Sequence, residues 1–282
     1  MVKKAHFVTG KGGVGKSVVA ASLALAHSSK NKPILLAELN ENSFYKDFFD
    51  LPKLSYRPSH WQPGVDICQW SPEDCLKEYA LHLLKIESLY KLFLENPVSK
   101  SLIQVAPGLH ELALLGKVTS SPRRHGPPMD YDELVIDSFA TGHFLSLFKA
   151  PSAMAEAVQF GPMGEQSRGI DRWIRDPDFT EIHIVTLPEE LPITEAVELY
   201  HQIKKEFKLT PKVYLNKILG LSEVDLKNLE PVMKKDLLLT IEEEENARNT
   251  LKKNKVSFTE LLLIPTIKSE NLVEELAGRL RD

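Results

Sequence analysis

The chain has 282 residues, of which 43% are hydrophobic and 26% charged, and a formal net charge of −4. This ordinary globular composition with a slightly acidic balance gives no reason to expect a nucleic-acid partner. We find no secretory leader pattern and no apolar run near the ~20 residues of a membrane span, so we expect a cytoplasmic protein without intrinsic membrane insertion.

Two cysteines, Cys68 and Cys75, exclude a disulfide scaffold, and the six residues between them do not match zinc-pair spacing. A pair of thiolates could hold a metalloid, but two buried thiols in a reducing compartment are the simpler interpretation. The sequence leaves open whether this pair binds anything.

The first forty residues predict a strand, a loop, a helix and a second strand. Residues 5–10 (AHFVTG) form a short apolar run that ends in glycine, and residues 17–30 carry small and apolar side chains at helical spacing. The next strand is expected over residues 33–40 (PILLAELN). This order opens a doubly wound α/β fold.

Five further apolar runs predict strands that are buried on both faces. Their near-continuous hydrophobicity suits a mostly parallel sheet with helices on each side. The runs are residues 65–70, 133–137, 182–187, 212–216 and 261–265, with helices expected over 195–207 and 269–281.

We expect one domain over residues 1–282, with helical insertions at about 72–104 and 151–176 clustered at one end of the sheet. The Pro/Gly-rich stretch 121–128 (SPRRHGPP) is interpreted as a solvated loop.

The segment GKGGVGKS, Gly10 to Ser17, fits the Walker A pattern and lies between a predicted strand and a predicted helix. Glycines let backbone N–H groups converge on phosphate oxygens, and the helix N-terminus adds positive potential. Lys16 is expected to reach the β- and γ-phosphates and Ser17 to ligate Mg²⁺. The sequence therefore predicts an ATP/ADP site with Mg²⁺, contacted by Gly12, Gly13, Val14, Gly15, Lys16, Ser17 and Val18.

Lys11 is a second lysine that the phosphate loop alone does not require. The run KGGVGKS resembles the deviant Walker A motif of the ArsA, MinD and ParA class of ATPases. That resemblance implies a lysine that reaches across a dimer interface to the partner's nucleotide, much as an arginine finger does. The alternative is a solvated charge on the loop.

Later motifs resemble the ArsA family in particular, which includes arsenite-pump ATPases and the ATPases that target tail-anchored membrane proteins. Asp137 ends an apolar strand, and the following DSFATGH is similar to that family's DTAPTGH switch. The resemblance implies that Asp137 is a catalytic residue and that it binds Mg²⁺ together with Ser17. In the switch, His143 either senses the γ-phosphate or only bonds within its loop.

Two segments near the end of the chain extend the resemblance to nearly its whole length. VTLPEELPITEAVEL (185–199) is similar to a family strand and helix, and YLNKI (214–218) is similar to its adenine-site segment. The resemblance implies that Asn216 bonds the base and that Pro265 flanks the ring.

The sequence departs from the family where many members have an aspartate that orients the attacking water. Asn40 stands at that position. Asparagine cannot act as a base but can hold a water, and Glu38 and Glu41 are close enough to compensate, so we expect slow hydrolysis. The cysteine cluster of the arsenite ATPases and the CxxC pair of the eukaryotic targeting ATPases are both absent from this sequence.

The leading interpretation is a nucleotide-driven ATPase switch that forms a homodimer, or a heterodimer with a sister ATPase. The resemblance and the helical insertions suggest a hydrophobic membrane-protein client. Alternatives are a subunit that energises anion or metalloid efflux, and a regulatory nucleotide-binding subunit with poor hydrolysis. DNA partitioning ranks last because of the TGH switch and the acidic balance.

Overall fold

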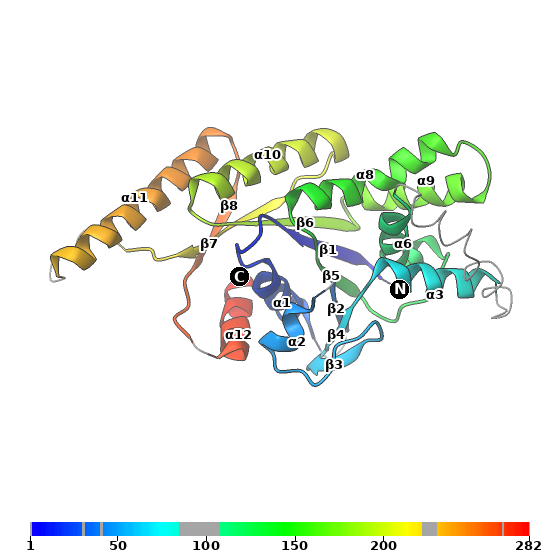
Figure 1. The fold of residues 1–282 in the computed structure, drawn as a ribbon, viewed down its shortest axis with the longest axis horizontal. Coiled ribbons are helices and arrows are strands. Elements are labelled where there is room, and N and C mark those ends of the chain that lie inside the picture. The colour runs from blue at the N-terminus through cyan, green and yellow to red at the C-terminus, as the bar shows by residue number, and fades with distance from the viewer. Residues whose placement is uncertain are drawn as a thin grey trace.

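An eight-stranded sheet forms the centre of the protein (Figure 1). The computed structural model describes residues 2–29, 32–39, 42–84, 108–221, 230–266 and 268–281. Neighbouring strands are parallel, except that β3 is antiparallel to β4, and the order is β3-β4-β2-β5-β1-β6-β7-β8. The strands are β1 (Lys4–Thr9), β2 (Ile34–Glu38), β3 (Ser59–Gln62), β4 (Val65–Gln69), β5 (Glu133–Asp137), β6 (Thr180–Thr186), β7 (Lys212–Ile218) and β8 (Phe258–Leu262).

Helices cover both faces of this sheet (Figure 1). On one face α1 packs against α12, and on the other face lie α8 and α10, with α6 and α9 packed on α8 at the end nearer β3. The helices are α1 (Lys16–His27), α2 (Phe44–Phe48), α3 (Pro72–Leu84), α6 (Leu109–Val118), α7 (Ser120–Arg123), α8 (Thr141–Ala157), α9 (Pro162–Ile174), α10 (Glu190–Phe207), α11 (Pro231–Lys253) and α12 (Ser269–Leu280).

The strand alternation divides the buried side chains into two cores. In β1, Phe7 packs on the α8 side, where its ring centroid lies 4.9 Å from that of Phe148. Val8 points the other way and joins the core beneath α1 and α12. Both faces are therefore closed to water, which is why the strands read as continuous apolar runs.

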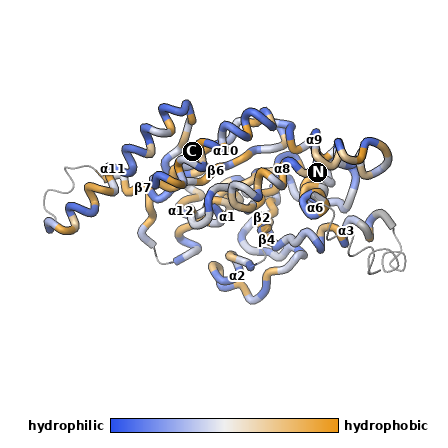
Figure 2. The backbone as a smooth tube through the Cα atoms, turned by 45° about the horizontal axis from the view of Figure 1, so that its top comes forward, coloured by the Kyte–Doolittle hydropathy of each residue, from blue (hydrophilic) through white to orange (hydrophobic). Residues whose placement is uncertain are grey.

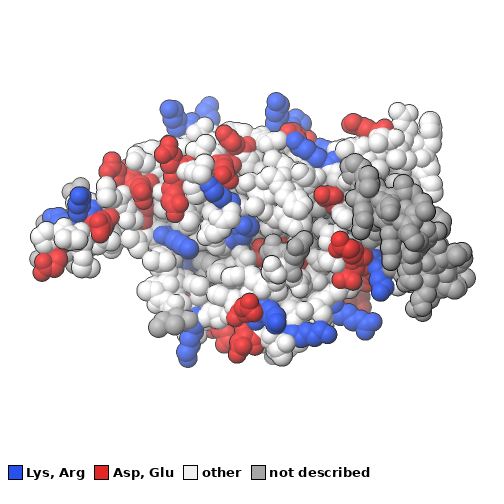
Figure 3. All heavy atoms as spheres, in the orientation of Figure 1, with Lys and Arg blue, Asp and Glu red and all other residues white. Residues whose placement is uncertain are grey.

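Polarity follows this layered plan. Figure 2 shows hydrophilic positions along the outer helices α10 and α11 and hydrophobic ones through the central strands. Basic and acidic side chains are interspersed on the face shown in Figure 3. Among the described helices, none combines the length and apolarity needed to cross a bilayer.

The seven strands expected from the sequence are present, and the mostly parallel α/β sheet is confirmed. The last strand was expected at 261–265 but runs over β8, so Pro265 lies three residues beyond its end. The sequence reading did not assign β3, α2 or the 23-residue helix α11. Their side chains are mostly exposed, which removes the apolar pattern that marks a buried element.

The helices of the structure do not coincide with the two predicted helical insertions. Helix α3 lies at the beginning of the segment 72–104, and residues 85–107 lie outside the described part of the chain. In the segment 151–176, α8 already begins at Thr141 and continues through Pro151, and α9 follows.

The interpretation of 121–128 as a solvated loop is wrong for its first half. Residues 120–123 form α7, and Arg123 is half-buried. Its guanidinium donates to the Gly116 carbonyl oxygen at 2.8 Å and to the side-chain oxygen of Gln166. Arg123 therefore ties α6 to α9, because a guanidinium supplies several donors from one side chain.

Candidate functional site

The glycine loop leaves β1 at the carboxyl edge of the sheet and enters α1. Gly10, Gly13 and Gly15 have φ angles of 144°, 83° and 95°, which favour glycine. A Cβ on Gly10 would lie 2.1 Å from the Val185 carbonyl oxygen, so this position admits no side chain. The loop passes against β6 here and exposes Gly12 and Gly13 to solvent, while Val14 is buried beneath it.

Asn216 supports this loop from β7. Its side-chain nitrogen donates to the Val14 carbonyl oxygen at 2.9 Å, and a Cβ on Gly15 would lie 2.6 Å from the same nitrogen. Asn216 is thus adjacent to the loop, with its amide occupied by backbone. The role that the resemblance implies for it, bonding the base, stays a prediction, as does the role of the exposed Pro265.

Lys16 and Ser17 begin helix α1, with Val18 half-buried behind them. The Lys16 ammonium donates to the Lys11 carbonyl oxygen at 3.0 Å. Burial lowers the pKa of Lys16, and the negative charge of Asp137 opposes that shift. The Tyr45 hydroxyl of α2 donates to the Ser17 carbonyl oxygen at 2.9 Å, which fixes the start of the helix.

Asp137 ends β5 and is fully buried. Within the described residues, its two carboxylate oxygens have no hydrogen-bond partner, and neither does the hydroxyl of Ser138. Burial raises the pKa of Asp137 to about 6, while the Ser17 hydroxyl and the Lys16 ammonium act in the opposite direction. Buried polar groups are normally paired, so three orphaned oxygens together indicate a site for a ligand.

The chemistry of these groups fits Mg²⁺, which prefers carboxylate, hydroxyl and water oxygens. Ser17 would supply the hydroxyl, and Asp137 would supply the anionic oxygens. The glycine loop adds unshielded backbone donors for phosphates. This arrangement is able to hold a nucleotide triphosphate and its cation.

Glu38 ends β2 directly beside Asp137 in the sheet register. Its carboxylate accepts the Ser43 hydroxyl at 2.6 Å and the Phe44 backbone N–H at 2.7 Å, so it organises the turn into α2. Its negative charge also raises the pKa of Asp137. Asn40 and Glu41 lie outside the described residues, so the water-holding role expected of Asn40 stays a prediction.

Lys11 forms an ion pair within its own chain. Its ammonium lies 3.2 Å from a carboxylate oxygen of Glu195 in α10, and both side chains are about 30% exposed. The other oxygen of Glu195 accepts the Thr141 hydroxyl at 3.3 Å. Glu195 therefore joins the glycine loop to the first residue of α8.

The segment after Asp137 contacts both the loop and the helical end. Thr9 at the end of β1 donates to the Phe139 carbonyl oxygen at 2.8 Å. The half-exposed His143 stacks on the Phe139 ring at 3.8 Å between centroids, and its Nε2 lies 3.9 Å from a carboxylate oxygen of Glu111 in α6. A pocket of about 630 Å³ opens beside this contact, lined by the ends of β2 and β4, the first turn of α3, α6 and the segment 139–143.

Cys68 and Cys75 are both buried, on β4 and α3. Burial raises the pKa of each thiol, to about 12 for Cys75, against the opposing charge of Lys117. Soft metals and metalloids bind thiolates, so protonated thiols in this setting are poor ligands for them.

Two contributors to the site were not assigned any role from the sequence. Glu195 lies within a segment quoted for its resemblance, and nothing in the local pattern marks it as a partner of Lys11. Tyr45 belongs to a five-residue helix that has no periodic signal. Three-dimensional proximity alone reveals both.

The pKa of Asp137 makes stability depend on pH in the metal-free, nucleotide-free protein. Between the ordinary value of 3.8 and about 6, the folded chain holds a proton that the unfolded chain has lost. The free energy of unfolding therefore falls as the pH rises towards 6. Above pH 6 the loss is constant, at about 3 kcal/mol, since each pKa unit corresponds to about 1.4 kcal/mol. We expect Asp137→Asn to unfold at higher urea than the parent at pH 8, with the difference shrinking below pH 6.

The control for this measurement is Asp178→Asn, which alters an exposed aspartate. Its urea midpoint is expected to follow that of the parent at every pH. If the parent has a higher urea midpoint than Asp137→Asn at pH 8, the buried carboxylate is stabilised by groups other than those described.

Comparison with known proteins agrees with this geometry. The chain is 29% identical over 212 residues to the ATPase BagA of Mycobacterium tuberculosis, covering 70% of this chain and 60% of that protein. It is 25% identical over 281 residues to the ATPase GET3C of Arabidopsis thaliana, covering 80% and 69%. It is 22% identical over 235 residues to the arsenical pump-driving ATPase of Acidiphilium multivorum, covering 78% and 40%. The match thus spans 60% of the length of the mycobacterial relatives.

A family model described as anion-transporting ATPase (ArsA ATPase) matches residues 3–162, which is more than half of the chain. This range contains the glycine loop, Asp137 and the switch segment. The chain belongs to the ArsA family of anion-transporting ATPases.

Proposed function

We propose that this protein binds and hydrolyses ATP with Mg²⁺ at the Gly10–Ser17 loop and uses the nucleotide state to rearrange its helical end. The observation that carries the proposal is the buried carboxylate of Asp137, without a hydrogen-bond partner among the described residues, beside Lys16 and Ser17. A bound cation and triphosphate would satisfy these groups.

The residues of the loop have distinct tasks in this proposal. Lys16 exchanges the Lys11 carbonyl oxygen for the β- and γ-phosphates, and the loop N–H groups hold the phosphate oxygens. Mg²⁺, ligated by Ser17 with Asp137 in its shell, would neutralise charge on the transferred phosphoryl group. Asn40 holds the attacking water, so hydrolysis is slow.

The proposal includes a dimer in which Lys11 serves the partner's nucleotide. In the single chain this lysine is paired with Glu195, and both groups are part-exposed. A part-exposed surface pair of this kind stabilises by about 1 kcal/mol or less, so a triphosphate can compete for the lysine. When Lys11 leaves, Glu195 can still accept the Thr141 hydroxyl without a neutralising charge beside it, which connects dimer closure to the first residue of α8.

The helical end is the proposed output of the switch. His143 and Phe139 lie between the end of β5 and α6, so a shift of the switch segment changes the pocket that they line. Phe160, in the turn from α8 into α9, is 87% exposed, and Met163, in the first turn of α9, is 47% exposed. These side chains support a hydrophobic client, for which we propose the apolar tail of a membrane protein.

The other functions are less well supported. Metalloid efflux requires thiolate ligands, and the two buried cysteines are held as thiols. A regulatory subunit that binds nucleotide without turnover differs from the proposal only in its rate of ATP hydrolysis, which we assign to Asn40.

Two lysine variants separate the roles within the loop. Lys16→Ala should weaken ATP binding by at least tenfold, because it removes the charge that faces the phosphates in the same chain. Lys11→Ala should leave the binding of a fluorescent ATP analogue nearly unchanged but lower kcat by about a hundredfold or more, since a trans cation acts in the transition state. Lys205→Ala, an exposed lysine of α10, is the matched control.

Light scattering of the parent with Mg²⁺ and a non-hydrolysable ATP analogue gives the assembly state directly. We expect twice the single-chain mass, and the single-chain mass with Lys11→Ala. A parent that stays monomeric and a Lys11→Ala variant with normal turnover would together refute the trans role.

Asn40 sets the rate in this proposal. We expect the parent to turn over fewer than about one ATP per second, at the low end of ordinary enzymes, and Asn40→Asp to raise kcat about tenfold. Asn40→Ala should be slower than the parent because it loses the water-holding amide. Ordinary turnover in the parent, unchanged in Asn40→Ala, would contradict this assignment.

The client proposal is tested with a photo-crosslinking side chain at position 160, and with one at the exposed, polar position 201 as the control. The probe is a 20-residue apolar helical peptide with polar ends. Crosslinking at 160 that depends on the ATP analogue, with none at 201, is expected. Equal labelling at the two positions, or labelling that ignores nucleotide, argues against a client site at this turn.

A further inference from the structure

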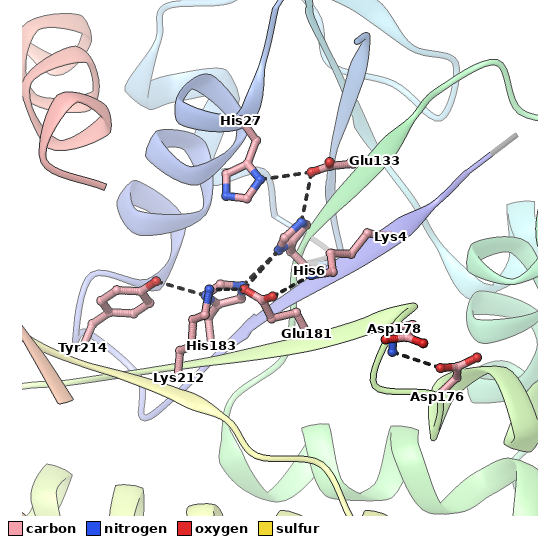
Figure 4. Close-up of polar contacts among 10 residues, drawn as sticks. All are labelled: Lys4, His6, His27, Glu133, Asp176, Asp178, Glu181, His183, Lys212 and Tyr214. Atoms are coloured by element: carbon pink, nitrogen blue, oxygen red, sulfur yellow. Dashed lines mark hydrogen bonds and ion pairs between the residues drawn. The ribbon is translucent and has the colours of Figure 1, made fainter. Parts of the chain in front are cut away.

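A cluster of three histidines and two glutamates lies at the end of the sheet opposite to the glycine loop (Figure 4). Its members come from β1, α1, β5 and β6, and they are His6, His27, Glu133, Glu181 and His183. They share the face that α1 covers, since His6 and Val8 point to the same side of β1. The proposed ATPase uses none of them.

Glu133 is the meeting point of the outer half of this cluster. One of its carboxylate oxygens, Oε2, lies 3.1 Å from His6 Nε2 and 3.0 Å from His27 Nδ1. Figure 4 shows both rings turned towards this carboxylate. These three ligand atoms lie within 4.8 Å of one another.

We propose that His6, His27 and Glu133 bind one divalent transition-metal ion of the zinc class, with a fourth position open to water. Zinc takes imidazole nitrogens and carboxylate oxygens at about 2.0–2.2 Å, so tetrahedral ligands lie about 3.3 Å apart. The separations of Glu133 Oε2 from the two imidazole nitrogens, 3.1 and 3.0 Å, are within a few tenths of an ångström of that spacing. The ligand atoms of His6 and His27 lie within 4.8 Å of each other, and ion binding requires that this separation also approaches about 3.3 Å.

The inner ligand, His6, is fully buried, whereas the outer ligands, His27 and Glu133, are partly accessible to an ion from solvent. The side chains of His27 and Glu133 are 31% and 20% exposed. Burial lowers the pKa of His6. A neutral imidazole has one lone pair, and the tautomer that is protonated at Nδ1 places it on Nε2, which faces Glu133. The two histidines hold the pKa of Glu133 below its usual range, which keeps the carboxylate charged.

A relay behind His6 fixes the orientation of the ring. His6 Nδ1 lies 3.1 Å from His183 Nε2, and His183 Nδ1 lies 3.2 Å from the Tyr214 hydroxyl. When His6 Nε2 binds the ion, Nδ1 carries the proton and donates to His183, which in turn donates to the Tyr214 oxygen. Outer hydrogen bonds of this kind orient metal-binding histidines in proteins.

The inner glutamate is a poorer ligand for the same ion. Glu181 lies 2.9 Å from the Lys4 ammonium and 2.6 Å from the Lys212 ammonium, so two cations already neutralise it and repel a third. Among the described ion pairs, the partners of Glu133 are histidines alone. The charges therefore favour the Glu133 side for the ion.

The test titrates Zn²⁺ into the chelator-treated full chain, without nucleotide or Mg²⁺, by calorimetry, and Co²⁺ by visible absorption. We expect one ion per chain and cobalt bands of a four-coordinate site. His27→Ala, at the exposed edge, should weaken binding at least tenfold, and Tyr214→Phe should weaken it less. His201→Ala, which removes an exposed histidine of α10, should match the parent.

Thermal unfolding with and without Zn²⁺ provides a second measurement of binding and also reports whether each variant folds. Zn²⁺ should raise Tm in the parent and in His201→Ala but not in His27→Ala, because only a folded site gains from the ion. No saturable binding by the parent, equal affinity in the parent and His27→Ala, or binding lost in His183→Gln but kept in His27→Ala would overturn the assignment.

Discussion

A buried carboxylate at the carboxyl edge of a parallel sheet is unfavourable unless a cation or donor reaches it, and this protein places Asp137 there. The elements around it are arranged to supply that compensation. The adjacent strand β1 continues into a loop in which Gly10, Gly13 and Gly15 have positive φ angles, and that loop brings Lys16 and Ser17 to the same point. The fold therefore keeps Asp137 in an unfavourable environment, and in the proposed function a bound cation would compensate its charge.

Helix α1 connects this site to the opposite end of the sheet. It begins at Lys16 beside the phosphate loop and ends at His27 in the histidine cluster, a span of about 17 Å. A metal ion bound by His27 would fasten the far end of the helix to β1 and β5. The start of the helix is already held by the hydrogen bond from Tyr45 to the Ser17 carbonyl oxygen, so the ion would fix its position at both ends.

The central strands and the glycine loop were predictable because their signals are local. Continuous apolar runs identify β1, β2 and β5, and the spacing of glycines and Lys16 specifies a loop between a strand and a helix. Helix α11 was not predictable in the same way, since its long polar sequence buries little. The displaced position of β8 has a related cause, because an edge strand has fewer apolar side chains than a central one.

The contacts between distant segments were the part that the sequence did not reveal. Lys11 and Glu195 are 184 positions apart, and His6 and Glu133 are 127 apart. Each residue alone has an ordinary interpretation as a surface charge or a buried histidine. Only the strand order, which brings β1 between β5 and β6, turns them into pairs.

Whether Asp137 helps to hold the cation is tested most directly by measuring the affinity for ATP with and without Mg²⁺, in the parent and in Asp137→Asn. If the buried carboxylate helps to hold the cation, Mg²⁺ should tighten ATP binding in the parent by at least tenfold and have little effect in the variant, while both bind metal-free nucleotide. Equal tightening by Mg²⁺ in the two proteins would contradict the account.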